Sequence, residues 1–349
     1  MQRIAIQRPG GRDQLQLETV PDLQPGPGEV RVAVAAIGVN FADIAIRLGL
    51  YESAKKYVGW PITPGFETAG VIDAMGPGAE VQLAAQGLAL GAQVIAVSRF
   101  FGYASQVVVP VAHLVPLPAG WSLAQGAAFP VAWLTAWYGL HHLAHARAGE
   151  RVLVHSAAGG VGQALVQLAV AQGCRVMGTV GSPGKVACVA ALGAEKVVVR
   201  APGQLWPAVE AWSPGGIDII LDANGLETLA DDYRHLAAAG RLVVYGHASM
   251  LDRGGARTPL WKLAWRWLRT PRWNPLDMTT ANKSVLAFNL SFLFDRTELL
   301  QEAMAFLLAR VASGQAKPLP VTLFPLARAA DAHLALESGT TMGKLILEP

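Results

Sequence analysis

The 349-residue sequence contains only two cysteines, Cys174 and Cys188, and neither lies in the first 123 residues. Two cysteines cannot form a disulfide framework, so we expect a reducing compartment, the cytoplasm. Long apolar runs are also missing, since no stretch reaches the roughly 18 to 20 residues that span a bilayer. The first residues lack the apolar core of a signal peptide. We therefore expect neither export nor membrane spanning.

Charge is scarce as well. Charged residues make up 15% of the chain, and no block of five like charges occurs. The formal net charge of +3 is small for this length, which argues against a nucleic-acid partner. Hydrophobic residues reach 52% and glycines number 37, as in α/β proteins whose parallel strands are buried on both faces. The length predicts two packed domains.

Two sequence patterns divide the chain. Residues 1–123 carry short β segments between proline and glycine turns, which predicts a β-rich domain. From residue 124 to 289, buried strands, glycine turns and apolar helices alternate, which predicts a doubly wound parallel sheet. We expect residues 290–349 to return to the first domain. The strands are predicted at 29–37, 67–74, 93–97, 105–109, 151–156, 175–180, 196–199, 217–222, 241–246, 285–289, 320–324 and 344–347, and a late helix at 297–313.

A glycine-rich turn follows the strand at 151–156 and leads directly into an apolar helix. Glycines there let the backbone approach a pyrophosphate, and the helix N-terminus offers N–H groups to phosphates. A tight turn that binds nothing is the alternative, but the regular strand order favours a dinucleotide site. Asn224 and Tyr245 close the next two strands where a dinucleotide would cross the sheet. The turn itself, an A-x-G-x-x-G pattern, comprises Ala157, Gly159, Gly160, Val161 and Gly162.

The end of the strand at 175–180 distinguishes NAD from NADP. An NAD site would offer an acidic residue to the ribose 2′-hydroxyl. This sequence has Ser182 and Lys185 there, and Arg200 at the end of the next strand. Hydroxyl and cationic groups suit a 2′-phosphate. Although Lys185 alone could be a solvated lysine at a helix start, the missing acidic residue favours NADPH.

The sequence resembles the zinc-free quinone oxidoreductases of the medium-chain dehydrogenase/reductase superfamily over nearly its whole length. The likeness lies in the segments IGVNFADIAIRLGLY, PGFETAGVI, HSAAGGVGQALVQLA and GTVGSPGKVACVAALGA. Within that family it is more similar to the vesicle amine transport protein homologues, through GRLVVYGHASM, a Trp-rich insertion at 250–283 and ANKSVLAFNLSFL. The resemblance implies a GroES-like catalytic domain, a Rossmann NADPH-binding domain with a cleft between them, and a homodimer. It also implies that Phe288 and Asn289 lie at the cofactor.

Zinc-dependent members of the superfamily bind their catalytic metal with a cysteine and with the histidine of a G-H-E motif. Residues 39–41 of this chain, Val-Asn-Phe, occupy the cysteine segment, and the motif reads Gly65-Phe66-Glu67. Phenylalanine cannot bind a metal, so we expect no metal site. The HHLAH histidines, His141, His142 and His145, lack a third ligand, and we expect them on a helix surface.

By resemblance, the polar groups near the reacting carbons are Asn40 and Tyr51, with Asp43 in support. A turn-capping asparagine and a partly buried core tyrosine are the alternatives for the first two. The predicted reaction is hydride transfer from NADPH to a quinone or an α,β-unsaturated carbonyl, whose enolate oxygen needs only one or two donors. An enoyl-thioester reductase and a catalytically silent, membrane-associated NADPH-binding homologue remain the alternatives.

The segment 258–276 carries four of the ten tryptophans and four cations. Its spacing predicts an amphipathic helix that stops at Pro271. Three interpretations stay open: a packed helix, a lid over the substrate, or a peripheral membrane contact through 259–275. The apolar face comprises Leu260, Leu263, Ala264, Trp267 and Leu268, and the cationic face Lys262, Arg266 and Arg269.

Overall fold

The computed structural model describes residues 1–201, 203–251 and 258–349, which form two compact units. Unit 1 comprises Met1–Val131 and Pro318–Pro349, and unit 2 comprises Ala132–Lys317. Helix α12 (Thr297–Ala312) therefore belongs to unit 2, although we expected the chain to leave that domain at residue 290. The reason is packing, because Phe306 of α12 lies against Trp137 and His141 of the same unit.

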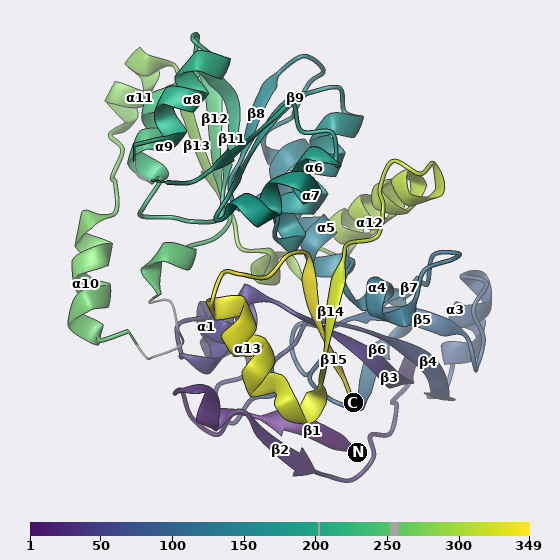
Figure 1. Ribbon diagram of the computed structural model, residues 1–349. Coiled ribbons are helices and arrows are strands. Elements are labelled where there is room, and N and C mark those ends of the chain that lie inside the picture. The colour runs from purple at the N-terminus through teal and green to yellow at the C-terminus, as the bar shows by residue number, and fades with distance from the viewer. Residues whose placement is uncertain (202, 252–257) are drawn as a thin grey trace. The chain divides into compact units, whose positions relative to one another are not determined.

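Unit 1 is built on a mixed sheet in which the two ends of the chain meet. Figure 1 shows the yellow C-terminal strands beside the purple β3, with β15 pairing antiparallel to β3. Alternating apolar residues of β3 are buried in the core, which explains its strand pattern. The strand order is β14 (Val321–Pro325), β15 (Lys344–Glu348), β3 (Glu29–Val39), β4 (Glu67–Met75), β5 (Gln93–Val97) and β7 (Leu114–Pro116), while β6 (Gln106–Pro110) also pairs with β3 and β1 (Gln2–Ala5) pairs with β2 (Gln16–Thr19).

Short helices complete unit 1. Helix α1 (Phe41–Arg47) begins directly after β3, and its first turn carries Asp43. Helix α13 (Ala329–Glu337) connects β14 to β15 and contributes buried His333. The other α-helices that lie entirely in this unit are α2 (Glu52–Tyr57), α3 (Ala79–Ala85) and α4 (Leu123–Ala127).

Unit 2 is a doubly wound domain around one parallel sheet. Every strand pair in it is parallel, so the carboxyl ends of all strands meet at one edge. The predicted fold class, a β-rich domain plus a doubly wound α/β domain, is confirmed. The strand order is β10 (Lys196–Val199), β9 (Arg175–Val180), β8 (Arg151–Val154), β11 (Ile217–Asp222), β12 (Leu236–Val244) and β13 (Ser284–Ala287), with helices α5 (Pro130–Trp137), α6 (Gly160–Ala171), α7 (Val186–Ala190), α8 (Leu205–Trp212), α9 (Leu229–His235), α10 (Leu260–Arg269) and α11 (Pro275–Ala281).

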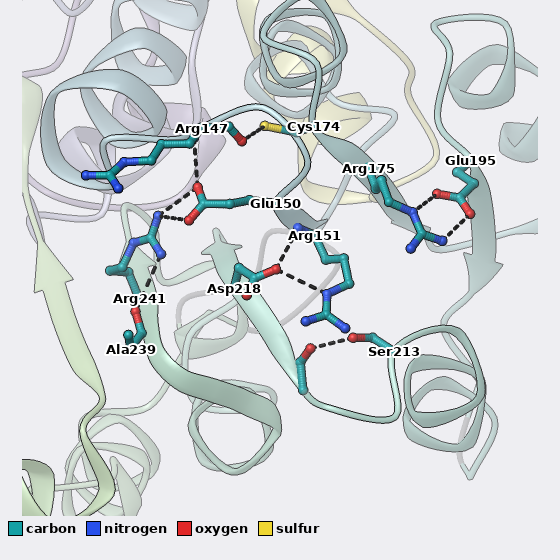
Figure 2. Close-up of polar contacts among 11 residues, drawn as sticks. Arg147, Glu150, Arg151, Cys174, Arg175, Glu195, Ser213, Asp218, Ala239 and Arg241 are labelled. Carbon is teal, nitrogen blue, oxygen red and sulfur yellow. Dashed lines mark hydrogen bonds and ion pairs between the residues drawn. The ribbon is translucent and has the colours of Figure 1, made fainter.

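The amino-terminal edge of this sheet is closed by ion pairs (Figure 2). Arg151 Nε lies 3.1 Å from Asp218 Oδ2, and Arg241 Nη2 lies 2.9 Å from Glu150 Oε1. Cys174, at the same edge, donates to the Arg147 carbonyl, and burial raises its pKa to about 11. The thiol is therefore protonated near neutral pH, and Arg151 and Arg241 are each paired with a carboxylate.

The segment predicted to be an amphipathic helix is helix α10, and part of its expected apolar face is exposed. Trp267 and Leu268, on the expected apolar face, are 62% and 60% exposed. Arg266, on the expected cationic face, donates from Nη1 to the Met250 carbonyl 2.8 Å away. Arg266 thus faces its own unit, whereas Arg269 is exposed beside Trp265. Figure 1 shows α10 standing apart from the six-stranded sheet. Residues 252–257 of the predicted insertion lie outside the described residues.

Candidate functional site

The glycine turn lies between β8 and α6, at the carboxyl edge of the parallel sheet. Ser156 adopts a left-handed conformation with φ of 52°, which turns the chain sharply after the strand. A Cβ at Gly162 would collide with the Ser156 carbonyl, so this position requires glycine. Ala157 is fully buried, and its N–H donates to Thr179 O of β9 at 2.9 Å. The turn therefore presents the N-terminus of α6 at the sheet edge.

A second turn, after β11, is joined to the glycine turn. Asp222 Oδ1 accepts hydrogen bonds from the backbone N–H groups of Asn224 and Gly225, which shapes the turn. Asn224 Oδ1 then accepts from Ser156 Oγ at 2.9 Å. Asn224 is only 3% exposed, and its Nδ2 has no hydrogen-bond partner among the described residues. A buried unused donor between two such turns fits a site that is completed by a polar ligand.

The residues predicted to select NADPH lie at the neighbouring strand ends. The Arg200 N–H donates to Val180 O of β9 at 2.7 Å, which places Arg200 beside the segment of Ser182. Arg200 Nη1 is buried without a hydrogen bond in the described structure, and its ion-pair partner, Glu227 Oε2, is 3.7 Å away. Lys185 is 8% exposed rather than solvated, and burial lowers its pKa. Two cationic residues and a serine thus follow the ends of the neighbouring strands β9 and β10.

The remaining predicted cofactor residues close β12 and β13. The Tyr245 N–H donates to Asp222 O at 3.0 Å, and the Tyr245 ring stacks on Phe288 at 6.4 Å between centroids. Phe288 also packs on Tyr138 at 4.8 Å. Asn289 begins the short helix Leu290–Leu293 by accepting from the Ser291 N–H at 3.1 Å. The sheet order therefore brings all the predicted cofactor residues to one edge.

Sequence reasoning missed a buried polar cluster directly beneath the two turns. His155 Nε2 lies 2.7 Å from Asp232 Oδ1, and His155 Nδ1 lies 3.1 Å from Thr179 Oγ1. Burial lowers the His155 pKa to about 4 and raises those of Asp222 and Asp232 to about 7. The only hint in the sequence is a histidine between an apolar strand and the glycine turn.

Asn40, predicted to contact the cofactor or substrate, is already bound within unit 1. Its Oδ1 accepts from Lys344 Nζ at 2.6 Å, and its Nδ2 donates to Glu67 Oε1 at 2.9 Å. Lys344 Nζ also lies 2.7 Å from Glu67 Oε1 and 2.9 Å from Val39 O. Both ends of the Asn40 amide are thus held by a buried Lys344–Glu67 ion pair, which the sequence did not reveal.

Asp43 supports the same region. Its Oδ2 accepts from the Asn40 N–H at 2.8 Å, and its Oδ1 accepts from the Gly65 N–H at 3.0 Å. Tyr103 bridges Asp43 and His333, with both contacts at 3.1 Å. Burial raises the pKa of Asp43 to about 7 and lowers that of His333 to about 3. Asp43 therefore joins α1 to the Gly65 segment, as expected for a supporting residue.

At the position of the zinc-ligand motif, Phe66 belongs to an aromatic cluster. Its ring packs edge-on against Tyr51 at 6.0 Å and lies 5.5 Å from Phe100. Within the described part of the chain, the one group of three ligand-type side chains with donors within 4.8 Å is His155, Asp222 and Asp232 of unit 2. The helix histidines are not part of such a group: His141 packs on Phe306, and His142 stacks on Tyr138.

Comparisons with known proteins place the chain in a family. The alcohol dehydrogenase GroES-like domain matches residues 26–119, and the zinc-binding dehydrogenase family matches residues 192–347. The synaptic vesicle membrane protein VAT-1 homolog of Rattus norvegicus is 32% identical over 343 residues, which cover 97% of this chain and 82% of that protein. The chain belongs to the medium-chain dehydrogenase/reductase superfamily.

Solved structures of the superfamily agree with this assignment. The quinone oxidoreductase of Thermus thermophilus, also solved in complex with NADPH, has a TM-score of 0.79 at 34% identity and is matched over 100% of both chains. CurK enoyl reductase has a TM-score of 0.82 at 26% identity, over 99% of this chain and 98% of that one. This superfamily member is an NAD(P)H-dependent oxidoreductase. None of its described helices is both long and apolar enough to cross a bilayer.

Proposed function

We propose that the protein reduces quinones or α,β-unsaturated carbonyls with NADPH and without a catalytic zinc. The observation that carries the proposal is the carboxyl edge of unit 2. A glycine turn, the unused buried amide donor of Asn224 and the partly buried side chain of Arg200 all lie at this edge. When bound, NADPH supplies the hydride. The glycine turn and the α6 N-terminus would hold its pyrophosphate, and Ser182, Lys185 and Arg200 its 2′-phosphate.

The proposal needs no Lewis acid because a quinone or an enone is already electrophilic. Phe66 fills the position of the usual zinc ligand with a ring, in contact with Tyr51 and Phe100. Tyr51 is the candidate donor to the developing enolate oxygen. Asn40 is assigned to positioning instead, because Lys344 and Glu67 already engage both ends of its amide.

Reduction of an enoyl thioester is the second candidate. It is favoured by the likeness to CurK enoyl reductase, which covers nearly the whole chain. The two activities share the hydride step and the need for a donor at the enolate oxygen. They differ in the acceptor, so an acceptor panel separates them.

Two partners belong to the proposal as well. A homodimer is implied by the family resemblance. A peripheral contact with an anionic membrane through residues 259–275 is supported by α10, where Trp261 is 72% and Trp265 50% exposed. The guanidinium of Arg269 lies 4.5 Å from the Trp265 ring centroid, so cation and aromatic ring are presented together.

Calorimetric titration with NADPH and NADH tests the cofactor assignment. We expect NADPH to bind at least about tenfold tighter, because cations at the ends of β9 and β10 stabilise the 2′-phosphate. Lys185→Ala should weaken NADPH binding by about 1–3 kcal/mol and leave NADH binding unchanged. Lys196→Ala, on the neighbouring strand β10 and bonded to the Ala208 carbonyl, is the control. Equal affinities for the two cofactors would contradict the assignment.

A further inference from the structure

The cluster of His155, Asp222 and Asp232 lies next to the two turns proposed to bind the cofactor, the glycine turn and the turn after β11. The proposed function assigns no role to this cluster. All three side chains are fully buried. His155 directly precedes the glycine turn, whereas Asp222 shapes the turn after β11 through the N–H groups of Asn224 and Gly225. Asp232 belongs to α9, and its Oδ1 accepts a hydrogen bond from the His155 Nε2–H at 2.7 Å. The cluster therefore joins the two turns from below.

Without an additional proton, one carboxylate oxygen of the cluster has no hydrogen-bond donor. Asp222 Oδ2 accepts from Thr228 Oγ1, and both Asn224 and Gly225 donate to Oδ1. Asp232 Oδ2, in contrast, is buried without a partner among the residues that the structure describes. One ring nitrogen of His155 and one carboxylate oxygen each of Asp222 and Asp232 lie within 4.8 Å of one another. A proton shared by the two carboxyl groups would satisfy Asp232 Oδ2 and remove one of two negative charges from a dry site.

The surroundings contribute little compensating charge. Burial keeps His155 neutral by lowering its pKa to about 4, so it cannot balance a second carboxylate near neutral pH. Arg200 is the cation whose charge acts on both His155 and Asp232. The groups that face the pair from the packed elements are His155 after β8, Thr179 of β9, Arg200 after β10, Thr228 and Asp231 at α9, and Tyr245 after β12.

We propose that Asp222 and Asp232 share one proton, and that this proton holds the glycine turn and the turn after β11 together. His155 and Asp232 are then positioning residues, and loss of the proton weakens the hydrogen bonds that connect the two turns. The part concerning cofactor affinity rests on the proposed NADPH binding. Burial raises the pKa of each carboxyl group from 3.8 to about 7. The arrangement in which the proton connects the two turns is therefore favoured below about pH 7 and disfavoured above it. NADPH affinity should therefore fall as the pH rises.

Asp232→Asn is the decisive variant. Asparagine keeps an oxygen for the His155 Nε2–H and offers an N–H to Asp222, so it mimics the shared-proton state without a titrating group. Asp277→Asn is the matched control, since Asp277 is an exposed acidic residue in the first turn of α11 in the same unit and is not among the groups that face the pair. Asp232→Ala removes the network altogether and should weaken NADPH binding at every pH.

The experiment measures the NADPH Kd between pH 6 and pH 9 in the presence of a chelator, so that no cation can take the place of the proton. We expect the wild-type Kd to rise at least about fivefold between pH 7 and pH 9, and the Asp277→Asn Kd to rise in the same way. The Kd of Asp232→Asn should stay low and independent of pH. The melting temperature of the apo protein should show the same contrast between pH 6 and about pH 8. Asp232→Asn should gain on the wild type over that range, and the difference should then stay constant because the pair is deprotonated in both the folded and the unfolded wild type.

A wild-type Kd and melting temperature that do not change over this range would overturn the proposal. So would an Asp232→Asn profile that follows the wild type. If Asp232→Asn does not fold, the infrared band of a protonated carboxyl group in the wild type, present at pH 6 and lost by pH 9, decides the matter. If NADPH fails to bind to any variant, the proposed function fails, while the apo melting curves still test the shared proton.

Discussion

The Tyr51 phenol lies at the rim of an apolar cluster, where its ring contacts Phe66 edge-on. If it donates to the enolate oxygen, removing the hydroxyl should lower turnover and leave NADPH binding unchanged. We expect Tyr51→Phe to lower kcat about tenfold with a quinone, near 1.4 kcal/mol, because solvent can deliver the proton to so strong an electrophile. A less activated enone should lose more.

The control for this prediction is Tyr57→Phe, the same change at the other end of α2, where the ring lies under Arg99. Steady-state rates with one quinone and one enone give the comparison. Wild-type rates for Tyr51→Phe with both acceptors would show that the tyrosine is only a packing residue.

Lys344 offers a stability prediction at the same scale. Its ammonium is the buried partner of Glu67, whose side chain is completely buried. Lys344→Met should destabilise unit 1 by about 3–5 kcal/mol, because it leaves the Glu67 charge uncompensated. The double variant Lys344→Met with Glu67→Gln should recover part of that loss in chemical denaturation. Equal stability of the single variant and the wild type would contradict the role of the pair.

Single residues also show where sequence analysis reaches its limit. Gly162 and the replacement of a ligand by Phe66 were predictable, since each depends on local chain chemistry. Lys344 and Glu67 are 277 positions apart and meet only because β15 joins the sheet beside β3. The sequence could not show this ion pair, so Asn40 was predicted to contact the cofactor or substrate. In the structure its side-chain amide is hydrogen-bonded to Lys344 and Glu67. His155 and Asp232 were missed for the same reason.

At the scale of elements, strands with continuous apolar patterns were predicted almost to their ends. Predicted strands at 175–180, 196–199 and 217–222 are β9, β10 and β11 with the same bounds. Strand β12 instead begins at Leu236, five positions before the predicted start. Its first part contains three alanines, one of them with φ of 60°, and lies beside a register shift in β11. Alanine has a low β propensity, so the sequence did not predict a strand there. Pairing with β11 is what makes this part a strand.

Helix α10 was predicted as a helix, but periodicity could not show which side faces its own unit. With Trp261, Trp265 and Leu268 exposed, we expect the protein to sediment with vesicles that contain phosphatidylserine, and less with phosphatidylcholine alone or at high salt. The triple variant Trp261→Ser, Trp265→Ser and Leu268→Ser should lose this binding.

The control for vesicle binding is the pair Val81→Ser and Leu90→Ser, two exposed apolar residues of unit 1. It should bind vesicles as the wild type does. Equal sedimentation of the triple variant, or concentration-dependent self-association that the triple variant abolishes without any vesicle binding, would assign the exposed face to another role.

At the scale of the whole molecule, the predicted cofactor residues and the predicted catalytic residues lie in different units because the two units have different folds. Unit 2 gathers the predicted cofactor residues because a parallel sheet has one carboxyl edge. Unit 1 holds Tyr51, Phe66 and the buried Asn40–Lys344–Glu67 group. The fold class was predictable because it depends on the repeating pattern of strand, turn and helix along the chain. The acceptor was not, since it depends on the shape of a site that sequence does not encode locally.

The most direct test of the account is NADPH oxidation by the purified, chelator-treated protein with a panel of acceptors. The panel contains 1,4-benzoquinone, 9,10-phenanthrenequinone, a simple enone and a crotonyl thioester, with a primary alcohol and NADP⁺ tested in the reverse direction. We expect NADPH consumption with a quinone or the enone, no dependence on added zinc, and no oxidation of the alcohol. Consumption with the thioester alone would select the second candidate. Turnover that appears only with zinc, or no turnover with any acceptor, would contradict it.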